Sequence, residues 1–483
     1  MDIRIRRLIR LGLLAGLSFP AVAQSPAAKP ILPAPADPAI VHALAQVSAA
    51  TIQADIEKLV SFNNRSTLSS MDTDLPPSTG ASAAADWVES VYKSYSADCG
   101  GCLEVKRDEF IEPGVAGTRI TKPTKLTNVY AVLRGRDPAQ AKRMYLVTGH
   151  YDSRNTDTAD SHGPAPGAND DASGVAVSLE CARVLSKLKF PATLVFVAVA
   201  GEEQGLNGSR HLAKFAKEQG WDLEGVLNND IVGGDTTPGQ EKLEDKNVVR
   251  VFSEGIPAAA TPQQTAQIIS LGAESDSPSR ELARAVADVA QTYAGERGIH
   301  TQHLTVTAGA GFHPVLIFRR DRFLRGGDHT SFNQEGFTAV RFTEWRENYD
   351  HQHQNVRTEN GVEYGDLLKF VDFKYVAEVA RLNAATLAVL ASAPGAPKNV
   401  HVLTRSLDNS TELTWEAPAG APSATKYEVV WRDTSAPVWT MFADAGTATT
   451  LKLDVSKDNV IFGVRSVDAA GHRSAAVMPV TVR

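Results

Sequence analysis

Several residue types that commonly bind zinc occur along this chain in positions that a fold could bring together. The candidates are His150, Asp170, Glu203, Asp230 and a late histidine in the segment 350–353, which contains His351 and His353. Three carboxylates and two imidazoles can hold two zinc ions when one carboxylate is shared. Glu202 stands beside Glu203 and is free to act as a base. The set therefore predicts hydrolysis by a metal-activated water.

Three of these candidates follow runs that predict buried strands. His150, Glu203 and Asp230 come after the apolar runs 144–148, 193–200 and 225–229. In open α/β sheets, ligands bind beyond the carboxyl ends of the strands. We therefore expect the three side chains to meet at one edge of a sheet.

Each motif also has a plainer interpretation when it is taken alone. Asp152 could hold the second ring nitrogen of His150, although both could be surface turn residues. The segment 166–174 has glycines and carboxylates that suit a helix cap, but two adjacent Asp residues beside Asn exceed what a cap needs. Glu202 and Glu203 could lie in a solvated loop, but two acids directly after a buried strand are costly without cations. Asp230 could be a turn residue.

Together the motifs are specific. In chain order they are His-x-Asp, Gly-Ala-Asn-Asp-Asp-Ala-Ser-Gly, Gly-Glu-Glu, Asn-Asp and a late His. Over residues 40–393 this resembles the co-catalytic di-zinc aminopeptidases of clan MH, the bacterial leucyl aminopeptidase and glutamate carboxypeptidase group. Residues 328–332 are also similar to the family's Ser-Asp-His segment, with Gly327 in place of the serine.

The resemblance implies a role for each candidate. Asp170 would bridge two Zn²⁺ ions, His150 and Asp230 would complete one site, and Glu203 and a late histidine would complete the other. Glu202 would be the general base, and Asp152 would orient His150. In the family, the last ligand is the histidine of a His-Thr-x-x-Asp pattern. His351 matches this histidine best, because Asn355 stands four residues on, where the pattern has Asp. His353 is the alternative. His329 is expected to be structural.

The composition indicates a soluble globular protein with more than one domain. The chain has 483 residues, 43% hydrophobic and 22% charged, with a net charge of −7. No basic tract is dense enough for a nucleic-acid surface. The amino-terminal residues 1–23 have the basic, apolar and small-residue parts of a signal peptide. We therefore expect export to the periplasm or medium, with no transmembrane segment and a flexible Pro/Ala-rich lead-in over 24–38.

Period and composition predict two structural domains. Helices are expected over 39–62, 83–95, 174–188 and 375–390, alternating with strands that include 126–133 and 339–343. This pattern favours an α/β fold with a mixed, mostly parallel sheet flanked by helices, the zinc exopeptidase fold, over residues 39–393. Alternating strands at 411–415, 426–431 and 460–467 favour an all-β sandwich over 394–483 that resembles a fibronectin type III module.

Two of the three cysteines are close in sequence. Cys99 and Cys102 are expected to form a structural disulfide in an oxidising compartment. Cys181 lies in an apolar helical pattern and is expected to be buried.

We expect an exported zinc exopeptidase that acts on peptides, with an aminopeptidase as the first choice. The alternatives on the same fold are a carboxypeptidase or dipeptidase, and a glutaminyl cyclase, which would use a single zinc. The non-enzymatic alternative is an inactive peptidase-like binding protein. In either case the C-terminal module could attach the protein to a surface or polymer.

Overall fold

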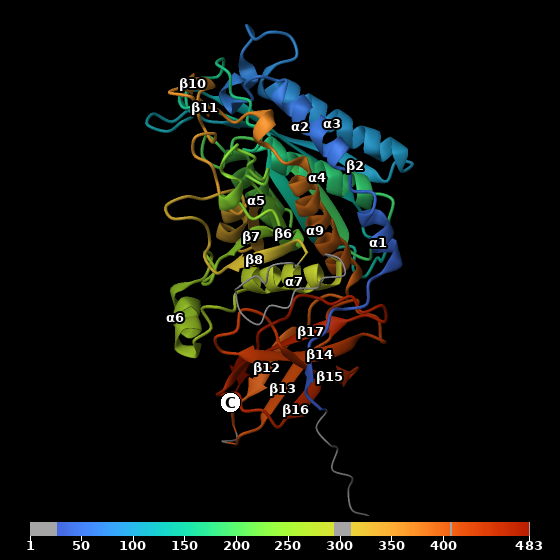
Figure 1. Ribbon diagram of the computed structural model, residues 1–483. Coiled ribbons are helices and arrows are strands. Elements are labelled where there is room, and N and C mark those ends of the chain that lie inside the picture. The colour runs from blue at the N-terminus through green and yellow to red at the C-terminus, as the bar shows by residue number, and fades with distance from the viewer. Residues whose placement is uncertain (1–26, 294–310, 406–407, 483) are drawn as a thin grey trace, which may run out of the picture.

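The computed structural model describes residues 27–293, 311–405 and 408–482 (Figure 1). The expected signal peptide lies outside these residues. Among the described helices, none is long and apolar enough to cross a membrane.

An eight-stranded mixed sheet forms the centre of the larger region. In spatial order its strands are β2 (Leu103–Glu112), β3 (Thr124–Leu133), β5 (Thr193–Val199), β4 (Arg143–His150), β6 (Asp222–Asn229), β9 (Ala339–Thr343), β7 (Val248–Ser253) and β8 (His313–Ile317). Neighbours β5, β4, β6 and β9 run parallel, so their carboxyl ends lie along one edge. The prediction of a mixed α/β sheet is confirmed.

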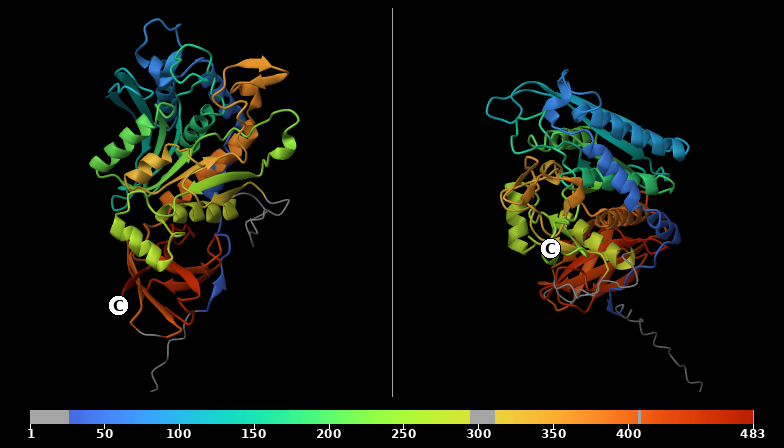
Figure 2. Two further views of the ribbon diagram at one scale, coloured as in Figure 1. Left: turned by 90° about the vertical axis from the view of Figure 1, so that its left-hand side faces the viewer. Right: turned by 45° about the horizontal axis from the view of Figure 1, so that its top comes forward.

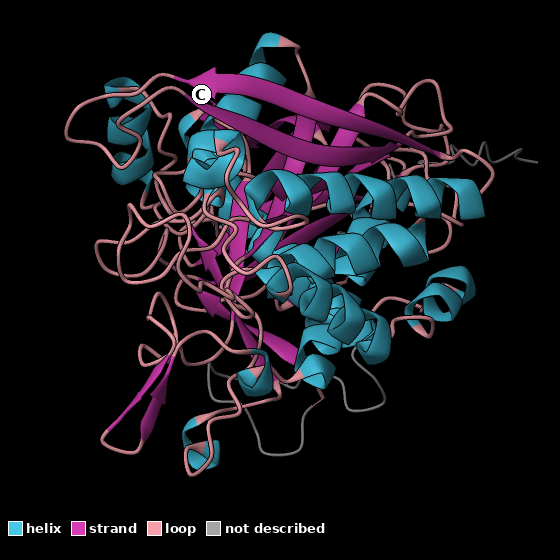
Figure 3. Ribbon diagram, turned by 90° about the horizontal axis from the view of Figure 1, so that it is seen from above, coloured by secondary structure: helices cyan, strands magenta, loops and turns pink. Residues whose placement is uncertain are grey.

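Helices cover both faces of this sheet. On one face lie α1 (Pro38–Leu44), α2 (Ala49–Val60), α3 (Gly80–Asp98), α4 (Ala172–Leu185), α7 (Pro278–Tyr293) and α9 (Phe373–Ser392). The other face is covered by α5 (Asn207–Glu218) and α8 (His329–Gln334). Figure 3 shows the helices as a layer that runs along the sheet. One further helix, α6 (Pro262–Leu271), projects from the body and has no buried residue.

The central strand β5 shows why an unbroken apolar run is needed here. Leu194, Phe196 and Ala198 pack into the larger helical layer. Val195 and Val197 pack into the opposite layer with α5 and α8. Because each side chain is fully buried, each large one contributes about 1.5–3 kcal/mol to folding.

One predicted helix is divided in the structure. The periodic segment 39–62 forms α1 and α2 with a turn between them. The break is stabilised at Ser48, whose hydroxyl accepts a hydrogen bond from the Thr51 amide and caps α2. The expected disulfide between Cys99 and Cys102 is present, and Cys181 is buried.

The C-terminal region consists of two four-stranded sheets. Their strands are β1 (Lys29–Pro30), β15 (Met441–Gly446), β14 (Lys426–Asp433) and β17 (Val460–Val467) in one sheet, and β16 (Thr450–Leu453), β13 (Thr411–Glu416), β12 (Lys398–Leu403) and β18 (Val480–Val482) in the other. Trp415, Tyr427, Trp431 and Phe462 belong to one buried apolar cluster of this region.

Residues 29–30 of the predicted lead-in form a strand in this region, which differs from the prediction that the lead-in is flexible. Lys29 and Pro30 pair antiparallel with Phe442 and Met441 of β15. Figure 2 shows the N-terminal segment beside the C-terminal sheets before it enters α1. Asp37 then caps α1, so one short segment joins both regions.

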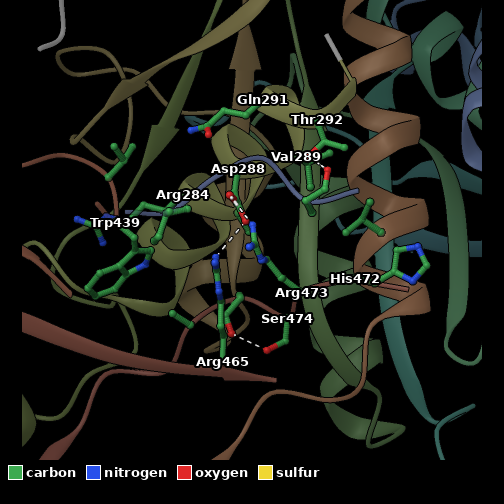
Figure 4. A pocket seen from close by; sticks show the side chains of 18 of the residues that line it. Arg284, Asp288, Val289, Gln291, Thr292, Trp439, Arg465, His472, Arg473 and Ser474 are labelled. Atoms are coloured by element: carbon green, nitrogen blue, oxygen red, sulfur yellow. Dashed lines mark hydrogen bonds and ion pairs between the residues drawn. The ribbon is translucent and has the colours of Figure 1, made fainter. Parts of the chain in front are cut away.

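Helix α7 packs directly against the C-terminal region. Trp439 Nε1 donates to Glu281 Oε2 at 3.0 Å, and Arg432 pairs with Asp276. In the cavity of Figure 4, Arg465 and Arg473 of the C-terminal region both approach Asp288 of α7, at 3.0 and 3.5 Å. Several of these charges are buried, so the linker at 391–397 is not the only connection between the two regions.

We predict that Arg432→Met lowers the free energy of unfolding by about 3 kcal/mol, because it leaves the buried Asp276 carboxylate with less compensation. Urea denaturation measures the change. Lys452→Met, which removes an exposed ion pair of the same region, is the matched control and should change stability by less than about 0.5 kcal/mol. Equal stability of the two variants would contradict an energetic coupling through this interface.

Candidate metal centre

The parallel strands bring the predicted residues to one edge of the sheet. His150 is the last residue of β4, and Asp230 directly follows β6. Glu202 and Glu203 lie in the loop after β5. Asp170 comes from the loop that leads into α4.

Close packing of α4 against these strands places Asp170 beside His150. A Cβ on Gly174 in the first turn of α4 would clash with the carbonyl oxygen of Asn229, the last residue of β6. Only glycine allows this approach. The neighbouring Asp171 caps α4 through the Gly174 amide and also accepts from the His150 amide, at 2.9 and 3.0 Å. The capping interpretation therefore holds for Asp171 and leaves Asp170 available for another role.

Two groups of potential metal ligands share Asp170. His150, Asp170 and Asp230 form the first group, and Asp170, Glu203 and His353 form the second. His150 Nε2 lies 3.1 Å from Asp170 Oδ1 and 3.9 Å from Asp230 Oδ1. His353 Nε2 lies 2.8 Å from Asp170 Oδ2 and 3.0 Å from Glu203 Oε1. Each oxygen of Asp170 thus faces a different group.

The chemistry of these atoms fits a bound metal. His150 Nε2 and Glu203 Oε1 are buried and make no hydrogen bond of ordinary geometry with any residue in the described ranges. Burial raises the pKa of Asp230 to about 7, even though His150 acts in the opposite direction. Burial lowers the pKa of His353, but the carboxylates of Glu203 and Asp170 outweigh it and raise that pKa to about 10. Without a metal, protons must offset the crowded negative charge, and a divalent cation can replace them.

The expectation that His351 is the last ligand is corrected by this geometry. His351 Nδ1 lies 3.2 Å from Asp235 Oδ1, and the ring stacks on Phe370 with centroids 3.7 Å apart. His353 reaches the centre instead, from a backbone with φ of 59°. The four-residue spacing from His351 to Asn355 gives no information about this local turn, so it favoured His351 over His353, which is the histidine that lies in the ligand group.

Asp152 has a role that differs in part from the one expected. The ring of His150 contacts the main-chain carbonyl of Asp152 at 3.1 Å, while the carboxylate is 3.5 Å away. The Asp152 carboxylate accepts hydrogen bonds from the amides of Glu202 and Glu203, at 3.2 and 3.1 Å. Asp152 therefore positions both glutamates as well as the histidine.

Glu202 is half-buried beside the centre. Burial raises the pKa of its carboxyl well above the usual range, and the negative charges of Asp230 and Glu203 act in the same direction, against the opposing effect of His150. A carboxylate with a raised pKa accepts protons more readily once it is ionised, and nearby divalent cations would keep it ionised.

Several residues of the centre were not predicted from the sequence. The Asp366 carboxylate accepts hydrogen bonds from the main-chain amides of Asn169 and Asp170, at 2.7–3.0 Å. These bonds fix the main chain at Asp170, whose carboxylate is shared by the two ligand groups. Gln352 Nε2 donates to Asp170 Oδ2 at 2.9 Å. Within the part of the chain that the structure describes, neither oxygen of the buried Asp328 has a hydrogen-bond partner of ordinary geometry. Only Asp328 had a sequence signal, since its segment resembles a family motif.

Two arginines form ion pairs with carboxylates of the ligand groups. Arg341 Nη2 is 3.0 Å from Asp230 Oδ1, and Arg154 Nε is 2.9 Å from Glu203 Oε2. His329, which was expected to be structural, contacts the carbonyl oxygen of Arg320 at 2.8 Å and takes no part in either ligand group.

Comparison with known proteins identifies the family. Residues 128–308 match the model of peptidase family M28. A probable zinc metalloprotease of Leptosphaeria maculans is 45% identical over 434 residues, which cover 90% of this chain and 95% of that protein. A probable zinc metalloprotease of Pyricularia oryzae is 45% identical over 443 residues, covering 90% and 83%.

Among solved structures, the LapA aminopeptidase of Legionella pneumophila is similar to the chain with a TM-score of 0.49 and 20% identity, over 75% of this chain and 77% of that one. This likeness is too distant to bear on activity. The close relatives and the family match, together with the buried His and Asp cluster, lead to one conclusion: the chain belongs to peptidase family M28 and is a zinc metallopeptidase.

Proposed function

We propose that this metallopeptidase is an exported aminopeptidase that uses two zinc ions. The observation that carries the proposal is the shared carboxylate. Asp170 Oδ1 faces His150 and Asp170 Oδ2 faces His353, so one side chain serves two separate ligand groups. A carboxylate with one oxygen toward each group would let two ions lie close together, as they do in two-metal sites.

The residues divide the chemistry between them. His150 and Asp230 would hold one ion, and Glu203 and His353 would hold the other. Two bound zinc ions would supply a water of lowered pKa and polarise the scissile carbonyl. Glu202 accepts a proton from the attacking water and delivers it to the amine that leaves. Asp152 keeps Glu202 in place through the main-chain amide.

The charge of the site favours a free amino terminus over a carboxyl terminus. Asp328 is a buried carboxyl with no hydrogen-bond partner of ordinary geometry among the described residues, and it lies close enough to Glu202 to raise the pKa of that carboxyl. A substrate ammonium would compensate such a negative charge. By contrast, the guanidinium groups of Arg154 and Arg341 already pair with Glu203 and Asp230.

Two other readings are less well supported. An inactive binding protein predicts a lost base or a lost ligand, whereas Glu202 and both ligand groups are present. A glutaminyl cyclase with one zinc does not require the second ligand group. Export rests on the signal-like residues 1–23, and sequencing the amino terminus of the secreted protein would test it.

The amino-terminal specificity can be tested directly. The protein should hydrolyse leucyl anilide and fail to hydrolyse its N-acetylated form, because acetylation removes the positive charge that the buried carboxyls would bind. Colorimetric release of the aniline measures both rates. Equal hydrolysis of the two anilides, or cleavage of a carboxy-terminal residue from an N-blocked peptide, would replace the aminopeptidase proposal with an alternative.

We predict that Glu202→Gln keeps both zinc ions and lowers turnover by about 10²–10⁴, the usual scale for a lost general base. Glu203→Gln should instead weaken zinc binding, because it removes charge from a ligand. Steady-state kinetics and elemental analysis separate the two effects. Retained zinc in Glu203→Gln together with lost zinc in Glu202→Gln would reverse the two roles.

His353→Ala should lose close to one zinc ion per chain, since it removes a ligand from one group only. His351→Ala should retain both ions, because His351 contacts Asp235 and Phe370 instead. Zinc content after dialysis against zinc-free buffer measures the difference. A larger loss in His351→Ala would restore His351 as the ligand.

A further inference from the structure

One exposed arginine reaches the metal centre without an acidic partner. Arg119 lies in the loop 113–123 between β2 and β3, and its Nη1 donates a hydrogen bond to the main-chain carbonyl oxygen of Glu203. Arg154 and Arg341 also contact residues of the ligand groups, but each of them pairs with a carboxylate. Among the described residues, Arg119 has no ion-pair partner, and Nη1 is its only donor atom in a hydrogen bond. Most of its donors, and its charge, are therefore available to a ligand.

The loop that carries Arg119 has a defined shape. The Val115 amide donates to the Ile120 carbonyl oxygen at 2.9 Å, and Thr118 Oγ1 lies 2.8 Å from the carbonyl oxygens of both residues. The Ile120 side chain is buried in the core of the larger region. The main chain is thus fixed on both sides of Arg119. A guanidinium on such a loop binds a partner with a smaller loss of conformational entropy than one on a mobile loop.

The centre has an acidic side and a basic side. A Cβ on Gly327 would lie 3.1 Å from Asp230 Oδ2, so the neighbouring Asp328 is on the side of the first ligand group. Arg119 contacts Glu203, which belongs to the second group. A peptide whose ammonium group approaches Asp328 has its scissile carbonyl between the two groups. Its leaving part then extends past the second group, toward Arg119.

We propose that Arg119 determines specificity by binding a carboxylate on the leaving part of the substrate, so that the enzyme favours peptides with a negative charge just after the scissile bond. This rests on the proposed function, because it places the substrate amino group at Asp328. The planar guanidinium matches a carboxylate in shape and charge. That carboxylate is either the terminal carboxylate of a dipeptide or an acidic side chain of the first leaving residue.

Two other effects must be separated from this one. Bound zinc ions attract any carboxylate, so a preference of the wild type alone does not identify Arg119. Loss of the contact with the Glu203 carbonyl could lower the turnover of every substrate. We therefore compare kcat/KM for a substrate that has the carboxylate with kcat/KM for the same substrate as an amide. The change in this ratio between the wild type and an Arg119 variant cancels both effects.

The experiment uses the purified, zinc-loaded full chain and two substrate pairs, with the release of leucine as the measurement. Leucylglycine and its amide test a terminal carboxylate, and leucylglutamic acid diamide analogues with Glu or Gln as the second residue test an acidic side chain. Arg119→Gln should lower the ratio of at least one pair by about 10-fold, the scale of one charge-assisted hydrogen bond. The change should be mainly in KM, because the carboxylate is bound equally in the ground state and the transition state.

Lys122→Gln is the matched control. Lys122 is an exposed cation of the same loop, but its Nζ lies 3.6 Å from Asp72 Oδ1 and it makes no contact with a ligand residue among the described contacts. Both ratios should remain as in the wild type. Circular dichroism checks that each variant is folded.

Unchanged ratios in Arg119→Gln, in a protein that hydrolyses leucyl anilide, would overturn this inference and leave the proposed function intact. An equal loss in Lys122→Gln would also overturn it, because the preference would then come from the general charge of the loop. A wild-type protein that cleaves none of the substrates with a free amino group would overturn the proposed function and this inference together.

Discussion

The structure depends on carboxylates that are buried together at the ends of parallel strands. Asp170, Glu203, Asp230 and Asp328 are nearly excluded from water and lie in one region. Buried charges of one sign destabilise a fold unless cations or protons compensate them. The surrounding imidazoles and guanidinium groups provide part of this compensation, and two zinc ions would provide the rest. The metal-binding chemistry follows from this crowding, because a proton and a metal ion compete for the same atoms.

Hydrogen bonds and ion pairs from surrounding residues hold the ligand side chains in place. Asp152 holds the amides of Glu202 and Glu203, and Asp366 holds the amide of Asp170. Outside them, Arg154 pairs with Glu203 Oε2 and Arg341 pairs with Asp230 Oδ1. These partners orient the ligand side chains, and such outer contacts distinguish a metal site from a chance group of acids.

The parts of the centre that sequence analysis found are those next to regular elements. His150, Glu203 and Asp230 follow apolar runs, and such runs indicate strands without knowledge of the rest of the fold. The parts that it missed depend on contacts between distant segments. His353 was not selected because a single left-handed residue in an irregular loop decides which histidine reaches the centre. Asp366 lies 196 residues from Asp170 and has no local motif that would reveal its contact.

The same distinction applies to the fold. The strands of the C-terminal region alternate clearly in sequence, but its attachment to the peptidase region does not appear in any periodicity. Trp439 and Glu281 lie 158 residues apart, and the lead-in strand β1 is only two residues long. Such elements are stable because of their partners, so their own propensities cannot predict them.

Anomalous diffraction at the zinc edge, from crystals of the zinc-loaded protein, tests the central claim most directly. The account predicts two peaks about 3.5–4 Å apart on either side of the Asp170 carboxylate, one beside His150 and Asp230 and the other beside Glu203 and His353. A single peak, or a peak between His351 and Asp235, would contradict it.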